Sequence, residues 1–387
     1  MQTLTRTEKI QAPRNRDDIG TPLPRKPWWR SSGETVVATA VAICLLETFF
    51  NCAGIGQQEF FEPDQKLGAR HIPSKQVTWR MEGLSRDRFN SFGMRDYERT
   101  LAKQPGTTRI AILGDSAAEG LQVPLKDTFP IALQNMLNQE ANKTDAEDKQ
   151  NQPYEVLNFG CAGYSSAQEI VQYETQVAKF SPDIVVLFYN QKDALESVID
   201  NSMRSITDPK PYCYLSPEGE LKFDNAIMEA RADELQPNPV LNWLRKDSRI
   251  YGVINQTLFS LSVNEKRFVK LKQWFTRQKQ SRKIAPAPYP KQDPDLVGAK
   301  LIQRLNADVK ATGGQLIVMM FPNTADYPDL KRQQELFGKL AQKEGFKYLD
   351  LTPHFKNYKN KQELIIEYHF SKKGHKFLAD LLKPYIH

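Results

Sequence analysis

Residues 109–120 read Arg-Ile-Ala-Ile-Leu-Gly-Asp-Ser-Ala-Ala-Glu-Gly and indicate how the chain folds. The apolar run at 109–113 is short and is followed by a glycine, which predicts a buried strand that ends at a turn. A helix is predicted to begin directly after Asp-Ser. Four further apolar runs have the same character, at 155–159, 183–188, 315–321 and 347–351, and helix-period segments lie between the runs at 129–137, 170–180 and 330–343. Strands that alternate with helices predict an α/β fold, here a five-stranded parallel sheet covered on both faces. In such sheets, functional sites form at the carboxyl ends of the strands.

Composition narrows the class of protein. The chain has 387 residues, of which 40% are apolar and 26% charged. These values are typical of a globular protein and exclude a disordered chain or a multi-span membrane protein. The net charge of +7 is spread over 53 basic and 46 acidic residues, so no nucleic-acid partner is expected.

No metal or cofactor is expected either. The four cysteines form no Cys-x-x-Cys pair and have no histidine at zinc-site spacing. The loop Gly114–Gly120 lacks the glycine patterns of phosphate-binding loops, which argues against a nucleotide-binding domain.

The N-terminal region predicts a membrane anchor. Residues 1–33 are expected to be a flexible tail, and residues 34–55 a signal-anchor transmembrane helix interrupted by Glu47. Basic residues precede the apolar run and acidic residues follow it, which favours a cytoplasmic N-terminus and an extracytoplasmic (periplasmic or extracellular) catalytic domain. A cleaved signal or a buried helix stays open, because the longest uncharged run, Thr35–Leu46, is shorter than the roughly 20 residues that span a bilayer.

The remaining chain divides into a lead-in segment, residues 56–106, and a catalytic-type domain, residues 107–387. Residues 197–300 are too long for one crossover between strands and predict an insertion within this domain. Inside it, Lys266–Lys283 holds eight basic residues and no acidic one. This stretch predicts either a basic amphipathic helix for an anionic surface or a solvated face over a small core.

Ser116 is the first candidate for chemistry. It lies between a strand end and a helix start, where backbone N–H groups and the helix dipole favour a developing oxyanion. A serine nucleophile suits that place, although a serine that caps a helix is also an ordinary structural device.

A histidine near the C-terminus supplies the complementary chemistry. His369 precedes the last helical pattern and can act as a general base if a carboxylate orients it, with Glu367 and Asp350 as the local candidates. A serine activated by histidine is the machinery of acyl transfer through an acyl-enzyme. His375 is expected to be a packed or capping residue, and His71, His354 and His387 have no comparable context.

Several blocks of the chain resemble, in the correct order, those of the SGNH/GDSL hydrolases, esterases and acyltransferases on a flavodoxin-like three-layer α/β/α sandwich. The resemblance implies that Ser116 is the nucleophile and that its own N–H and that of Gly163 donate to the oxyanion. The segments 61–68 and 90–98 are similar to the lead-in of membrane-anchored bacterial members. The matching blocks are Ile112–Val123, Asn158–Ser165 and His369–His375.

Two positions depart from the family pattern. Lys192 stands where the family has an oxyanion asparagine, which leaves Asn190 as the substitute, and Ile366 stands where the family has its aspartate, which leaves Glu367. The resemblance therefore implies a serine esterase or O-acyltransferase for ester-bearing small molecules or acetylated cell-envelope glycans. The alternative is a catalytically impaired member that binds a glycan or a partner protein.

Overall fold

The computed structural model describes residues 28–56, 59–80, 82–144, 154–190, 192–199, 209–232, 239–264, 289–321 and 330–386. The chain forms two units, residues 1–53 and residues 54–387. In the first unit, helix α1 (Trp28–Ala53) begins six residues before the predicted anchor. An 18-residue window in its Ser32–Ala53 part has a mean hydropathy of 1.9, and this part is long and apolar enough to cross a membrane, criteria that a signal sequence meets as well.

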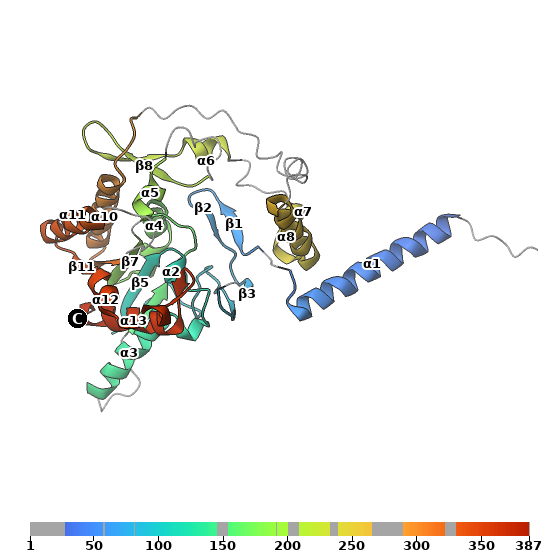
Figure 1. Cartoon of the computed structure of the whole chain (residues 1–387), viewed down its shortest axis with the longest axis horizontal. Helices are drawn as coiled ribbons and strands as arrows, with labels where there is room; N and C mark the ends of the chain where they lie inside the picture. Colours follow the sequence, from blue (N-terminus) through green and yellow to red (C-terminus); the bar gives the residue numbers. More distant parts are fainter. Residues whose placement is uncertain are drawn as a thin grey trace, which may run out of the picture. The chain divides into compact units, whose positions relative to one another are not determined.

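A five-stranded parallel sheet is the centre of the second unit (Figure 1). Its strands lie in the order β11-β10-β7-β5-β6, and every neighbouring pair is parallel. Counted as the chain enters the sheet, this order is 2-1-3-4-5, the flavodoxin-like order, so the predicted fold class is confirmed. The strands are β5 (Thr108–Gly114), β6 (Tyr154–Asn158), β7 (Ile184–Asn190), β10 (Gln315–Phe321) and β11 (Lys347–Asp350).

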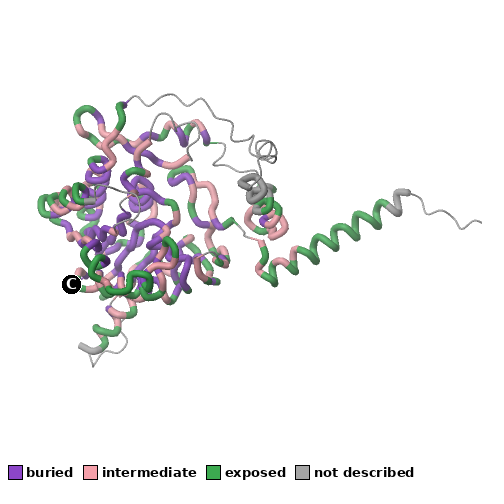
Figure 2. Tube along the Cα trace, in the orientation of Figure 1, coloured by how far each residue is buried: buried purple, intermediate pink, exposed green. Residues whose placement is uncertain are grey.

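Successive side chains of each strand point to opposite faces of the sheet, so the second unit has one hydrophobic core on each face. Ile110 and Ile112 of β5 pack toward α3, α12 and α13, whereas Ala111 and Leu113 pack toward α4, α10 and α11. The buried residues accordingly follow the sheet in Figure 2. Helices on both faces make the predicted three layers; their bounds are α3 (Phe129–Thr144), α12 (Thr352–Asn357), α13 (Lys372–Leu382), α4 (Ser166–Thr175), α10 (Pro294–Ala311) and α11 (Leu330–Glu344).

The predicted insertion, residues 197–300, overlaps the start of helix α10. Asp293 caps α10, which crosses back to the sheet from Pro294 onward, so the described insertion ends before residue 294 rather than at 300. The basic stretch 266–283 lies outside the described residues. The described elements between β7 and α10 are α5 (Asp193–Ser197), β8 (Tyr212–Leu215), β9 (Leu221–Asp224), α6 (Ala226–Ala230), α7 (Pro239–Asp247) and α8 (Arg249–Asn264).

Short elements complete the second unit. The lead-in segment contains two antiparallel hairpins, and another hairpin precedes α13. These elements are β1 (Phe61–Asp64), β2 (Gly68–His71), β3 (Gln76–Trp79), β4 (Ser85–Arg88), α2 (Ser116–Glu119), η1 (Leu125–Asp127), η2 (Val177–Phe180), η5 (Lys361–Glu363), β12 (Ile365–Ile366), β13 (His369–Phe370) and η6 (Lys383–Tyr385).

Candidate active site

Ser116 begins helix α2 at the carboxyl end of β5. Asp115 caps this helix, and its carboxylate accepts a hydrogen bond from the Ala117 N–H at 2.8 Å. Gly114 is required at the turn because a Cβ there would lie 2.7 Å from the Cβ of Ala118. The Ser116 side chain is half-buried, so its hydroxyl is held at the sheet edge with access from outside.

His369 reaches this hydroxyl from the hairpin before α13. The next residue, Phe370, is buried in the core, and Ser371 caps α13 by accepting from the Gly374 N–H at 3.1 Å. These two contacts fix the chain on the C-terminal side of His369. Its Nε2 lies 2.9 Å from Oγ of Ser116. The structure therefore brings together the predicted nucleophile and the predicted base, which lie far apart in the sequence.

The carboxylate on the other ring nitrogen is Glu82. Its Oε2 makes a short contact with Nδ1 of His369, and the two side chains are only 12% and 20% exposed. A carboxylate at Nδ1 selects the tautomer with the proton on that nitrogen, which leaves Nε2 free to accept a proton. Ser116, His369 and Glu82 thus form a hydrogen-bonded chain with the geometry of a catalytic triad.

Glu82 corrects the sequence-based assignment of the acid to Glu367. Ile366 pairs with His369 across the hairpin, so Glu367 lies in the two-residue turn, exposed and at a φ of +52°. The chain reverses there, and Glu367 makes no hydrogen bond or ion pair in the part of the chain that the structure describes. Asp350, the other candidate, accepts a hydrogen bond from the Thr352 N–H at 2.8 Å.

The β3–β4 hairpin carries Glu82 to the site. Ser85 at the start of β4 donates to the carbonyl of Leu121 at 2.6 Å, directly after α2. A Cβ on Gly83 would overlap the carbonyl of Gln122, so the loop approaches this backbone closely. The sequence signal for Glu82 is therefore weak: one acid beside a glycine, in a segment with no apolar periodicity.

Two backbone N–H groups at the site are available as oxyanion donors. Those of Ser116 and Gly163 make no hydrogen bond with any described residue. The loop that carries Gly163 is packed on the nucleophile turn, because the Cys161 N–H donates to the Gly114 carbonyl at 2.9 Å. Gly163 itself is exposed and has a φ of +79°, a conformation that favours glycine.

Asn190 is near the site but already engaged. It is buried at the end of β7, and its side-chain amide lies 3.4 Å from Oδ2 of Asp115. Its backbone N–H donates to Asp193 at 2.6 Å. Burial raises the pKa of both the Asp115 and the Asp193 carboxyl groups. One amide hydrogen of Asn190 remains for an oxyanion.

Lys192, which stands where the resembled motif has an asparagine, is loosely held. Its ammonium group is 3.8 Å from Oε1 of Glu196, and its side chain is 44% exposed. A loosely paired surface ammonium of this kind has no fixed direction toward Ser116.

His375 is buried and packed, as the sequence analysis predicts. Its Nδ1 accepts a hydrogen bond from the Phe129 N–H at 3.2 Å. Burial lowers the pKa of His375 to about 3, so its ring is neutral near pH 7. This residue supports the packing of α13 on α3 and takes no part in the triad.

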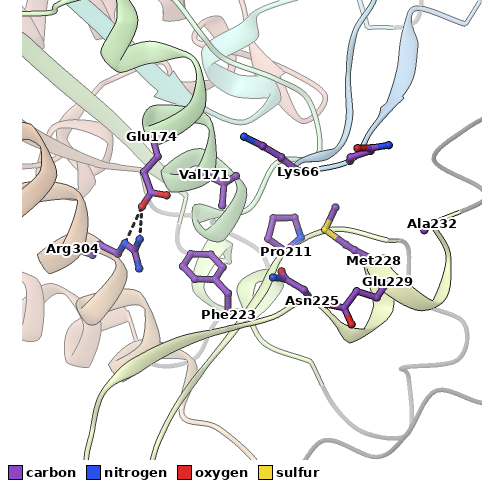
Figure 3. A pocket seen from close by; sticks show the side chains of 11 residues that line it. Lys66, Val171, Glu174, Pro211, Phe223, Asn225, Met228, Glu229, Ala232 and Arg304 are labelled. Atoms are coloured by element: carbon purple, nitrogen blue, oxygen red, sulfur yellow. Dashed lines mark hydrogen bonds and ion pairs between the residues drawn. The ribbon is translucent and has the colours of Figure 1, made fainter.

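Two cavities lie beside helix α4. One, of about 600 Å³, is lined by Gly163, Tyr164, Phe61 and Tyr212, so it adjoins the oxyanion donor. The other, of about 590 Å³, lies beside α4 and contains the Glu174–Arg304 ion pair that Figure 3 shows. No group of histidine, cysteine and acidic side chains suited to a metal ion occurs among the described residues.

Comparison with known proteins gave matches among solved structures. No family model and no curated protein matches the chain. TesA (11% identity, TM-score 0.36) is covered over 98% of its chain and 72% of this one. The acetyl xylan esterase AlAXEase (13%, TM-score 0.37) is covered over 100% and 72%, and a GDSL-like lipase from Bacteroides thetaiotaomicron (12%, TM-score 0.35) over 91% and 74%. At these identities and TM-scores the matches carry no argument about substrate or catalysis, which depend on the residues of this chain.

Proposed function

We propose that this chain is a serine esterase or O-acyltransferase for ester-linked acyl groups. The observation that carries the proposal is the 2.9 Å contact between Oγ of Ser116 and Nε2 of His369, with Glu82 on the opposite ring nitrogen. This arrangement supplies a nucleophile, a base and an orienting carboxylate in hydrogen-bonding order.

The reaction runs in two halves. His369 takes the hydroxyl proton at Nε2 while Oγ of Ser116 attacks the ester carbonyl carbon, and the N–H groups of Ser116 and Gly163 stabilise the resulting oxyanion. The tetrahedral intermediate collapses, and the leaving alcohol receives the proton from His369. Water or a second hydroxyl group then gives its proton to His369 and attacks the acyl carbon. The bond from that carbon to Oγ of Ser116 breaks, Oγ takes the proton back from His369, and an acid or a new ester leaves.

The surroundings of Gly163 support a proposal for the substrate class. The cavity beside Gly163 has about 600 Å³ of space and aromatic walls, which suits a sugar ring or a similar group next to the scissile ester. Acetylated cell-envelope glycans fit this description and also fit an anchored, extracytoplasmic enzyme. The anchor is α1, whose apolar part is preceded by basic residues.

Activity-based labelling tests the chemistry before any substrate is known. Wild-type protein is expected to hydrolyse p-nitrophenyl acetate and to react with a fluorophosphonate probe, and Ser116→Ala is expected to abolish both. Persistent labelling of the variant would show that another residue is the nucleophile. A folded wild-type protein without turnover or labelling would favour the alternative, an impaired member that binds a glycan or a partner protein.

Localisation needs its own experiment. We expect the full chain to stay in the membrane fraction after carbonate extraction, and protease added to the outer face of the membrane to digest the catalytic domain. Release of the chain by carbonate would contradict the anchor, and protection of the domain would contradict its extracytoplasmic side.

A further inference from the structure

A buried ion pair lies at the C-terminal end of helix α2. Glu119, the last residue of α2, is 0% exposed, and its Oε1 is 3.0 Å from Nε2 of His71 in the lead-in segment. The contact is an ion pair rather than an aligned hydrogen bond. A carboxylate removed from water in this way requires a positive partner.

The surroundings of His71 keep it doubly protonated. Its Nδ1 lies 3.1 Å from the carbonyl of Gly93, and its Nε2 lies 3.0 Å from Oε1 of Glu119 and 3.7 Å from Sγ of Cys161. Carbonyl and carboxylate oxygens beside the two ring nitrogens favour the imidazolium, which carries a proton on each nitrogen. The ring is also stacked on Phe89 at 4.1 Å between centroids. Burial opposes the charge on His71, but Cys161 and Glu119 outweigh it and raise the pKa of His71 to about 10. Burial also raises the pKa of the Cys161 thiol.

The second oxygen of Glu119 holds the oxyanion loop. Its Oε2 accepts a hydrogen bond from the Ala162 N–H at 3.0 Å, and Ala162 directly precedes Gly163. Gly160 packs so closely on α2 that a Cβ there would lie 2.7 Å from the carbonyl carbon of Ala118. The carboxylate one turn after Ser116 therefore sets where the Gly163 N–H lies relative to the nucleophile.

We propose that His71 and Glu119 are positioning residues for catalysis: the ion pair fixes the 160–163 loop on the nucleophile helix, so that the two N–H donors meet one oxyanion. This inference rests on the proposed esterase function. His71 had no sequence context that marked it, because its partner lies in a different part of the chain.

The test compares His71→Gln and Glu119→Gln with wild-type protein on p-nitrophenyl acetate. Loss of a complete oxyanion donor lowers kcat by about 10²–10³-fold, and a donor that is only displaced is expected to cost about 10- to 100-fold. We expect kcat per titrated active site to fall by that factor with KM changed less than about 3-fold. Inhibition by phenylboronic acid, which forms a tetrahedral adduct on the serine, is expected to weaken in step with kcat.

A merely structural role gives a different result. In that case the fraction of sites titrated by the fluorophosphonate falls, while kcat per titrated site and inhibition by phenylboronic acid stay at the wild-type values. This outcome would overturn the proposal. An increase in KM alone would overturn it as well. His375→Gln is the matched control, since it removes another buried imidazole that bears no carboxylate, and its kcat per titrated site is expected to be that of wild type.

The double variant H71Q/E119Q completes the design. Two neutral amides can still hydrogen-bond to each other and to the Ala162 N–H, so its loss in kcat is expected to be smaller than the product of the two single losses. Multiplicative losses would show that the residues do not act as a pair. If a single variant does not fold, the double variant is compared with wild type instead. It is then expected to show the same two effects, a lower kcat per titrated site and weaker inhibition by phenylboronic acid. Unlabelled wild-type protein would contradict the esterase function itself, a result separate from any of these.

Discussion

Replacing Glu82 by glutamine tests the triad most directly. The change keeps the size of the side chain but removes the charge beside Nδ1 of His369, and both side chains are at least 80% buried. At an effective dielectric constant of about 20, two unit charges about 4 Å apart attract by about 4 kcal/mol. The imidazolium that forms in the transition state loses this stabilisation, which corresponds to about 10³-fold in kcat/KM. The new amide can also donate to Nδ1 and stabilise the wrong tautomer of the ring.

The assay is steady-state hydrolysis of p-nitrophenyl acetate, normalised by active-site titration. Glu367→Gln is the matched control, because it removes the same charge from the exposed turn next to His369. Its kcat/KM is expected to stay within about 3-fold of wild type, as for other changes to surface charge. A loss for Glu367→Gln equal to that for Glu82→Gln, or near-normal activity of Glu82→Gln, would refute the assignment of the acid.

Three further predictions concern the supports of the site. Gly160→Ala would place a Cβ 2.7 Å from the carbonyl carbon of Ala118. This variant is expected to lower the free energy of unfolding by about 1–3 kcal/mol and to lower kcat. A denaturation midpoint equal to that of wild type would contradict this close approach. Folding lowers the pKa of His375 from 6.5 to about 3, so as the pH drops the ring is protonated in the unfolded chain before it is protonated in the folded one. The free energy of unfolding is therefore highest above pH 6.5 and falls progressively toward pH 3. At pH 5 this loss is about 2 kcal/mol, and His375→Gln should remove that part of the pH dependence in urea titrations; an unchanged slope would show that His375 is not buried as a neutral ring. Lys192→Ala breaks only the exposed pair with Glu196 and should leave kcat/KM within about 3-fold, whereas a loss of about 100-fold would assign Lys192 to the oxyanion site.

The sheet could be predicted because each strand carries its own signal. The run ending at Gly114 is apolar on both faces, and all five runs of this kind form the parallel sheet. Ser116 and His369 could be paired because each follows a recognisable boundary, a strand end or a helix start, and such boundaries meet at one edge of the sheet.

The acid and the positioning pair could not be predicted in this way. Glu82 and His71 lie in short hairpins whose strands have four residues each, and their roles arise only when those hairpins dock on the turn after α2. Docking of this kind depends on close backbone approaches, such as that of Gly83 to Gln122, which leave no periodic pattern in the sequence. Glu367 was favoured by its nearness in sequence, but the chain reverses direction at that residue.

The origin of Glu82 and His71 in the lead-in segment has a practical consequence for dividing the protein. Strand and helix alternation begins only at Thr108, so a truncated chain that starts there would keep the whole sheet, the serine and the histidine. It would nevertheless lack two of the charged groups that surround them. A shortened chain that is to keep both groups therefore has to start upstream of β1.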